Sequence, residues 1–317
     1  MNPELFAKDL ARKPAALRGL ADLLAVEHPW PALTPSNHLV FLGMGSSHYA
    51  NNIAASRMRA LGINAVAELA SSDLLPKATC ETVVIAVSAS GGSAETLAAQ
   101  EHYQDQCRII AVTNTADSKI TDGADTVVMM HAASEEGGIA CRSFQHTLAL
   151  LLDLESQLVG GLDVPSLIRA SAEATDDLLQ SRDTWLPKVS ELILGPQGTH
   201  VVAPARRLSS AQQSALMLRE GPRLPAVACE TGDWSHVDVY LTKSTDYRML
   251  LLAGSKWEPE LLRWVTERGS TLVAIGQDVP GSALNLRYRG DENDDVKLLT
   301  ETLVAELVAQ QAWAATT

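Results

Sequence analysis

Short apolar runs alternate with longer mixed segments along most of this chain. The clearest run, Val83 to Val87, is rich in β-branched residues and bounded at both ends, as is typical of a strand buried on both faces of a parallel sheet. Because helical patterns separate the runs, the sequence predicts βαβ units and an α/β fold with a mostly parallel sheet. The other strands predicted in the first half are His38–Leu42, Ala65–Ala67, Arg108–Val112 and Thr126–Met130.

Apolar residues at helical spacing predict the remaining elements of the first half. Residues 2 to 26 are expected to form a helical arm, and three prolines close it. Two long helices are predicted from Ile139 to Leu158 and from Val164 to Leu194. The closing prolines are Pro29, Pro31 and Pro35.

The second half of the chain repeats the first. The stretch from His38 to Glu68 matches the stretch from His200 to Glu230 without a gap, and each begins with a histidine before apolar residues and ends on glutamate. Two later strands also correspond, Met249–Ala253 to Val83–Val87 and Thr271–Ile275 to Ile109–Thr113. Such a match predicts two copies of one α/β unit, placed here at residues 1–195 and 196–317. A chance similarity between two βαβ units is the alternative.

Two loops in the first half combine glycine with hydroxyl side chains. Gly43 to Ser47 follows the first strand, and Ser88 to Ser93 lies between the strand at 83–87 and a helix. Backbone N–H groups and the positive end of a helix favour an anion at such a loop, and glycine allows it to come close. The second loop has no lysine, so it is not a nucleotide-binding P-loop. A plain βα turn with an N-cap serine is the alternative.

The two copies differ at these loops. Gly45 and Ser46 correspond to Arg207 and Leu208, and the loop at 88–93 corresponds to 254–259, which has no hydroxyl cluster. We therefore expect one site per chain, anchored on the first half and completed by other residues.

Composition excludes several classes of function. With a formal net charge of −13, the chain of 317 residues is a poor candidate for binding nucleic acid, although one locally positive site could still hold a small anion. No apolar h-region and no run of about 18 apolar residues is found, so neither a signal peptide nor a membrane span is expected. The cysteines lack paired or zinc-ligand spacing, which predicts reduced thiols in a cytoplasmic protein without a metal or cofactor. They are Cys80, Cys107, Cys141 and Cys229.

The loop motifs together resemble those of the SIS (sugar isomerase) domain family. Gly45-Ser46-Ser47 matches a motif Gly-Thr/Ser-Ser after a strand, the loop at 88–93 matches Ser-x-Ser-Gly-x-Thr/Ser, and 135–144 loosely matches an acidic stretch before a long helix. The chain resembles the tandem-SIS isomerase half of glucosamine-6-phosphate synthase and related stand-alone sugar-phosphate isomerases, deaminases and deglycases. The resemblance implies two tandem SIS domains, each with a flavodoxin-like, doubly wound sheet.

The resemblance also implies the site. In the family these loops hold a sugar phosphate, and the second half carries a catalytic glutamate followed sixteen residues later by a histidine. Here Glu220 and His236 have that spacing. Glu220 is the implied base that moves a proton between C1 and C2 of the sugar, and His236 assists ring opening. The implied substrate-binding residues are Gly45, Ser46, Ser47, Ser88, Ala89, Ser90, Gly91 and Ser93.

Departures from the synthase leave the reaction open. Met217 stands where the synthase has a lysine three residues before its glutamate, and neither a lysine-bearing tail nor a glutaminase domain is recognised. Glutamine-dependent amination is therefore not expected. Isomerisation, deamination and deglycation of a sugar phosphate stay open as alternative reactions. The implied assembly is a homodimer with a histidine donated across the interface, with a small sugar phosphate as ligand and no nucleic acid or membrane as partner.

Other interpretations of the same residues stay open. Glu220 could be a solvated carboxylate at a helix end, His236 a packed or capping histidine, and His48 a structural residue at a helix start. If Glu220 is not the base, Glu135, Glu136 and His48 are the next candidates. A dinucleotide-binding enzyme would need a complete Gly-x-Gly-x-x-Gly motif after the first strand, and the third glycine is missing. A non-catalytic sugar-phosphate sensor is the remaining alternative.

Overall fold

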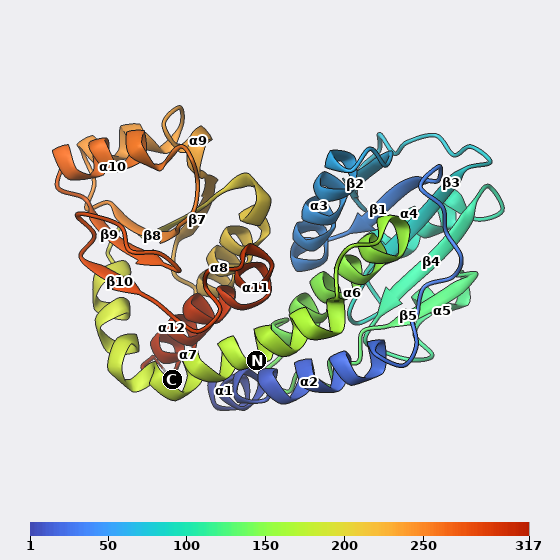
Figure 1. Cartoon of the computed structure of the whole chain (residues 1–317), viewed down its shortest axis with the longest axis horizontal. Helices are drawn as coiled ribbons and strands as arrows, with labels where there is room; N and C mark the ends of the chain where they lie inside the picture. Colours follow the sequence, from blue (N-terminus) through green and yellow to red (C-terminus); the bar gives the residue numbers. More distant parts are fainter. Residues whose placement is uncertain (317) are drawn as a thin grey trace. The chain divides into compact units, whose positions relative to one another are not determined.

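The computed structural model describes residues 1–316, which form two compact units. The first-sheet unit consists of residues 16–134 and 140–168, and the second-sheet unit consists of residues 1–15, 135–139 and 169 onward. Each unit contains one five-stranded parallel sheet (Figure 1). The α/β class and the parallel strands predicted from the sequence are thus confirmed.

The sheet of the first-sheet unit has the strand order β2-β1-β3-β4-β5, and all its pairings are parallel. Strand β3 is buried along its whole length, which is why it has a continuous apolar sequence without alternation. The strands are β1 (His38–Gly43), β2 (Ala65–Leu69), β3 (Thr82–Val87), β4 (Arg108–Thr113) and β5 (Thr126–Met129).

Helices cover both faces of this sheet. Helix α3 (Gly45–Ala60) packs on β1 and β2 and against α6 (Arg142–Val159), while α4 (Ala94–Tyr103) packs on β3 and against α5 (Lys119–Asp122). A two-pronged ion pair joins α3 to α6, because the Arg57 guanidinium donates to both carboxylate oxygens of Glu155 at 2.7 and 2.8 Å. Helices therefore connect β1 to β2, β3 to β4 and β4 to β5, as in a doubly wound sheet.

The sheet of the second-sheet unit has the order β10-β9-β8-β6-β7, which is the order of the first sheet repeated. The strands are β6 (Thr199–Ala203), β7 (Ala226–Glu230), β8 (Arg248–Leu252), β9 (Thr271–Ile275) and β10 (Leu284–Leu286). Strands β6, β7, β8 and β9 take the places of β1, β2, β3 and β4, as the ungapped match predicted. The strand order of the first sheet is therefore repeated in the second, as expected for two copies of one α/β unit.

Two helix layers enclose the second sheet (Figure 1). Helix α8 (Leu208–Glu220) packs on β6 and β7 and against α12 (Thr302–Ala314), which α11 (Asp294–Thr300) precedes. The opposite face carries a core of Trp234, Val239 and Leu261 against alternate strand residues. Those three come from α9 (Thr231–Trp234), the 3₁₀ turn η2 (Asp238–Lys243) and α10 (Glu258–Glu267), and a second 3₁₀ turn, η1 (Ala205–Arg207), precedes α8.

The N-terminal arm is two helices, not the single helix that the apolar spacing predicted. Helix α1 (Pro3–Ala11) ends before α2 (Lys13–Leu24) begins. Pro14 accounts for the break, since it has no N–H to donate and its ring would clash with the carbonyl of Leu10 in a continuous helix. Similarly, α6 begins at Arg142 and not at Ile139, because residues 135–139 belong to the second-sheet unit.

The compact units differ from the predicted division at residue 195. Helix α7 (Val164–Ile193) belongs to the second-sheet unit from Arg169 onward, together with α1 and residues 135–139. Within the described chain, no helix is long and apolar enough to cross a membrane. The four cysteines are all free thiols, and Cys141 and Cys229 are buried.

Candidate functional site

The first sheet has its topological switch point between β1 and β3. The chain leaves β1 toward β2 on one side, whereas β3 pairs with β1 on the other side and leads on to β4. In open parallel sheets, ligands bind outside the carboxyl ends of the strands at such a point. Both hydroxyl-rich loops start there, because residues 44–47 follow β1 and residues 88–93 follow β3. The structure therefore brings the two predicted loops to one edge of one sheet.

The loop after β1 leads directly into α3. Gly45 adopts a left-handed backbone with φ of +49°, and no side chain caps the start of the helix. Ser46 and Ser47 occupy the first turn and are partly exposed. A sixteen-residue helix presents its positive end here, which is favourable for an anion.

The loop after β3 is held in place by the loop after β4. The backbone N–H of Ser88 donates to Val112 O at 3.0 Å, Asn114 N–H to Ala89 O at 3.0 Å, and Ile120 N–H to Gly91 O at 3.1 Å. Gly91 has φ of +66°, and a Cβ there would lie 1.9 Å from Ser118 Oγ. Only glycine therefore fits at this point of the loop.

The three serines of this loop differ in their surroundings. Ser88 is buried, Ser90 is exposed, and Ser93 is the N-cap of α4, where its hydroxyl accepts from Thr96 N–H at 3.3 Å and donates to Glu95 at 2.9 Å. The N-cap alternative is thus correct for Ser93, whose hydroxyl already serves the helix. Phosphate binding by Ser88, Ser90 and Ser93 stays a prediction.

His48 lies in the first turns of α3, close to these loops. Burial lowers the pKa of its imidazole, and the backbone and charge of Glu68 oppose that shift only in part. Its Nδ1 atom is buried and has no hydrogen-bond partner among the described residues. His48 is therefore a neutral, half-buried side chain near neutral pH.

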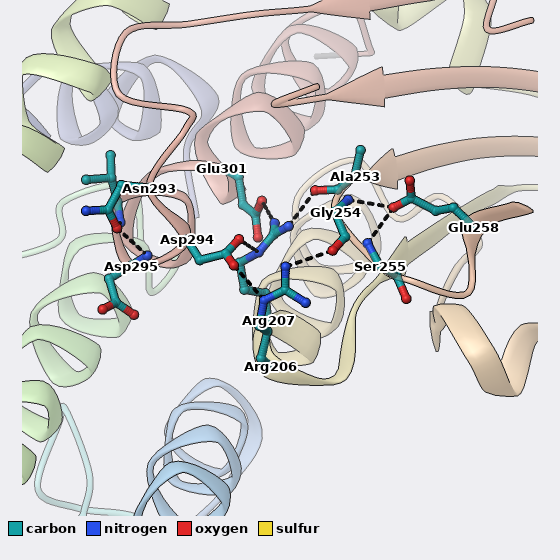
Figure 2. A network of polar contacts seen from close by, with 11 residues as sticks. Arg206, Arg207, Ala253, Gly254, Ser255, Glu258, Asn293, Asp294, Asp295 and Glu301 are labelled. Atoms are coloured by element: carbon teal, nitrogen blue, oxygen red, sulfur yellow. Dashed lines mark hydrogen bonds and ion pairs between the residues drawn. The ribbon is translucent and has the colours of Figure 1, made fainter. Parts of the chain in front are cut away.

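The second sheet has its own switch point, between β6 and β8. Charged side chains of the second-sheet unit occupy this switch point (Figure 2). The carboxylate of Glu258 accepts from the backbone N–H groups of Gly254 and Ser255 at 2.5 and 2.7 Å. The Arg207 guanidinium donates to Ala253 O at 2.5 Å and also contacts the buried carboxylate of Glu301.

These contacts bear on where an anion could bind. Glu258 takes the position of an anion at the loop after β8, and Arg207 bridges the loops after β6 and β8. Arg206 adds contacts to Gly254 O and to Asp294, both at 2.7 Å. The second copy lacks the hydroxyl-rich loops, as its sequence indicates, and has a network of polar contacts within the protein at the same switch point.

Glu220 is the last residue of α8 in the second-sheet unit. It is half-buried, and burial raises the pKa of its carboxyl, with a further increase from the negative charge of Glu135. Its position at the carboxyl end of a helix disfavours the ionised form in the same direction. The carboxyl of Glu220 therefore holds its proton more tightly than a solvated surface carboxyl does.

His236 is exposed and follows α9, on the other side of the second sheet. Its backbone N–H donates to Asp233 O at 2.8 Å. The neighbouring Trp234 packs into the core beneath α9 and α10, whereas Glu220 belongs to the layer of α8 and α12 (Figure 1). Glu220 and His236 thus belong to opposite helix layers of the second sheet, on either side of strand β7.

The sequence did not reveal a set of buried charges in the second-sheet unit. Lys13 Nζ donates to Glu306 Oε2 at 2.5 Å, and both side chains are fully buried. Glu306 lies within the apolar run of α12, and a buried carboxylate is rarely unpaired. Its position in the sequence could therefore have indicated a buried cationic partner. Elsewhere in the part of the chain that the structure describes, no cluster of three or more histidines, cysteines or acids could hold a metal ion.

Comparison with known proteins identifies the class of the first-sheet unit. The two parallel sheets are those of an α/β protein, and in doubly wound sheets of this kind ligands bind outside the carboxyl ends of the strands. Residues 32–154 match the model of the SIS domain. Residues 32–154 are thus similar to a SIS domain, and most of them belong to the first-sheet unit. The match does not extend to the second sheet, whose assignment as a SIS domain stays a prediction.

Curated relatives and solved structures agree with this result. The glutamine–fructose-6-phosphate aminotransferase [isomerizing] of Sulfolobus acidocaldarius is 22% identical over 245 residues, which cover 75% of this chain and 41% of the relative. The chain thus spans less than half the length of this relative.

Two solved structures share the fold over nearly the whole chain. The C-terminal domain of glucosamine-fructose-6-phosphate aminotransferase from Francisella tularensis has a TM-score of 0.80 at 16% identity, with 98% of this chain and 95% of that chain covered. The glucosamine-6-phosphate deaminase of Thermotoga maritima has a TM-score of 0.77 at 19% identity, with 98% and 95% covered. At these identities the likeness establishes the fold.

The fit of Gly91 against the Ser118 loop gives a test of the candidate phosphate loop. The Gly91→Ala variant is expected to lose at least about 1–2 kcal/mol of unfolding free energy from the left-handed backbone alone, before the contact with Ser118 is counted. Gly92→Ala is the matched control, because nothing lies within 4 Å of its Cβ position, and a change below about 0.5 kcal/mol is expected. Urea denaturation measures both, and equal midpoints would contradict the described loop geometry.

Proposed function

We propose that this chain acts on a sugar phosphate by moving a proton between C1 and C2. The reaction class is aldose–ketose isomerisation, or the deamination or deglycation of an amino-sugar phosphate. The observation that carries the proposal is the half-buried Glu220 carboxyl with its raised pKa beside Glu135. The names of the relatives support the class, since they include an isomerizing aminotransferase and a glucosamine-6-phosphate deaminase.

The phosphate would be held by the first-sheet unit. The loops after β1 and β3 offer the positive end of α3, the hydroxyls of Ser46, Ser47, Ser88 and Ser90, and a backbone that glycine allows close to an oxygen. The equivalent point of the second sheet is taken by Glu258, which favours one phosphate site per chain.

Glu220 would be the base of the proton transfer. A carboxylate works best when its pKa is near the working pH, because it must both take the proton from one carbon and return it to the next. Burial and the charge of Glu135 act in that direction. The sugar must first be in its open-chain form, and an exposed imidazole such as His236 can assist ring opening near neutral pH.

Removal of loop hydroxyls tests the phosphate site. The Ser88→Ala/Ser90→Ala double variant should bind inorganic phosphate and sugar phosphates roughly 10- to 150-fold more weakly per lost charge-assisted hydrogen bond, which is worth about 1.5–3 kcal/mol. Ser36→Ala, at the opposite edge of the same sheet, is the control and should bind as the wild type does. Calorimetry measures the affinities, and unchanged binding by the double variant would remove this loop from the site.

Replacement of the base tests the chemistry. A screen of aldose, ketose and amino-sugar phosphates by NMR first identifies the substrate. Glu220→Gln should then bind it nearly normally and lose turnover by roughly 10²- to 10⁴-fold, the usual share of acid–base catalysis. In deuterated water, the wild type should place deuterium on the carbon that receives the proton. Wild-type turnover by Glu220→Gln would refute Glu220 as the base, and binding without turnover by the wild type would favour the sensor alternative.

The same variant has a stability signature that depends on pH. Because the folded state raises the pKa of Glu220, it holds the proton more tightly than the unfolded state does. This stabilising contribution is complete below the unfolded pKa and is lost as the pH rises through the folded pKa. Glu220→Gln cannot ionise at this position and should therefore have a higher free energy of unfolding than the wild type at neutral pH. The same measurement shows whether the variant is folded.

We further propose that His236 serves a second copy of this chain. Glu220 and His236 belong to opposite layers of the second sheet, and His236 is exposed. A mixture of inactive Glu220→Gln with inactive His236→Ala should therefore regain part of the activity, because one site of a mixed dimer would be intact. Enzyme assays after subunit exchange, verified by mass spectrometry, measure the recovery. No recovery would mean that each chain builds its own site.

A further inference from the structure

Residues 135–139 fit closely against helix α1. The Gly137 N–H donates to the buried carboxylate of Asp9 at 2.7 Å, and the Asn2 N–H donates to Gly137 O at 3.1 Å. A Cβ on Gly137 would lie only 2.6 Å from the Cα of Phe6, so the two backbones are in contact. Hydrogen bonds and close backbone packing therefore hold this segment against α1.

The other end of the segment lies beside the end of α8. A Cβ on Gly221 would meet Ile139 Cδ1 at 3.5 Å and Trp313 Cε3 at 3.2 Å. Trp313 in turn lies near Phe6 of α1, with 6.3 Å between the ring centres. Because Gly221 follows Glu220 directly, Ile139 of the segment and Trp313 of α12 lie beside the end of the helix that carries the base of the proposed reaction.

Charged groups come together at the same place. Burial is the main reason that the pKa values of the Glu220 and Glu306 carboxyls are raised. The negative charge of Glu135 raises both pKa values further. Glu306 is in turn paired with Lys13, at the start of α2. On its own helix, Glu220 has the exposed Arg219 as its neighbour. The negative charge of Glu135 beside Glu220 is thus held by a segment that has no helix or strand of its own.

We propose that α1 is a positioning element for Glu220, because it holds residues 135–139 through Asp9 and so keeps the Glu135 carboxylate beside the base. This inference rests on the proposed role of Glu220. It assigns a function to the N-terminal helix, which lies outside both hydroxyl-rich loops and contacts α12 of the second-sheet unit.

The test measures the pKa of Glu220 without any substrate. Protein labelled with ¹³C at glutamate carboxyls is titrated by NMR, and the Glu220 signal is assigned by its loss in Glu220→Gln. Glu135→Gln should lower the pKa of Glu220, because a like charge is removed. Glu136→Gln is the matched control, since Glu136 pairs with exposed Arg12 at 3.0 Å, and it should leave that pKa unchanged.

Asp9 then tests the role of α1 itself. Asp9→Ala removes the acceptor of the Gly137 N–H and should lower the pKa of Glu220 while Glu135 is still present. Asp9→Asn keeps an acceptor oxygen and should retain the raised pKa. If Asp9→Ala does not fold, Gly137→Ala displaces the segment from α1 instead and should have the same effect.

The outcomes separate this inference from the proposed function. A folded Asp9→Ala or Gly137→Ala variant with the wild-type pKa at Glu220 would overturn the positioning role of α1. Full turnover by Glu220→Gln would instead overturn the proposed function and leave the pKa result intact. If both proposals hold, the acid limb of the pH–rate profile should move to lower pH in Asp9→Ala and in Glu135→Gln, but not in Glu136→Gln.

Discussion

The order of five parallel strands is the constraint on which the rest of this structure depends. Because the chain leaves β1 toward β2 on one side and returns in β3 on the other side, the loops after β1 and β3 diverge at one edge of the sheet. No side-chain interaction is needed to create that opening. The sequence decides only which side chains occupy that opening, and these side chains differ between the two units.

In the first-sheet unit the opening is lined with hydroxyls and glycine. In the second-sheet unit, Glu258 accepts the backbone N–H groups that would otherwise face an anion, and Arg207 bridges the loops to Glu301. A buried guanidinium and a buried carboxylate are costly alone but acceptable as a hydrogen-bonded pair. The second switch point is therefore a structural centre, and duplication of the fold does not imply duplication of a site.

The strands and the repeat could be predicted because both have local signals, whereas the strand order came from the structure. A fully buried strand such as β3 gives a continuous apolar run, and an ungapped match keeps the same elements in the same places. The break before α2 also had a local signal in Pro14, which the apolar spacing outweighed. The candidate loops followed from glycine and serine between a strand and a helix, although only the structure identified Ser93 as an N-cap.

The remaining features depend on contacts that no local pattern contains. Lys13 and Glu306 are 293 positions apart, and their pairing follows from the packing of α12 in the second-sheet unit. Likewise, the sequence predicted a helix from Ile139, but the fit of Gly137 against Phe6 holds residues 135–139 on α1. Sequence patterns predict which elements form, whereas close packing between distant segments decides which charges become neighbours.

The contrast between Glu306 and Glu220 bears on function. Both carboxyls lose hydration on folding, but Glu306 gains the ammonium group of Lys13, while the charge that acts on Glu220 within the described chain is that of another carboxylate. A purely structural carboxyl is expected to acquire a partner, because an unpaired one costs stability. A carboxyl that is both desolvated and repelled is destabilising in its ionised form, and titratable groups perturbed in this way are common at functional sites. The surroundings of Glu220 thus support its proposed role as a base.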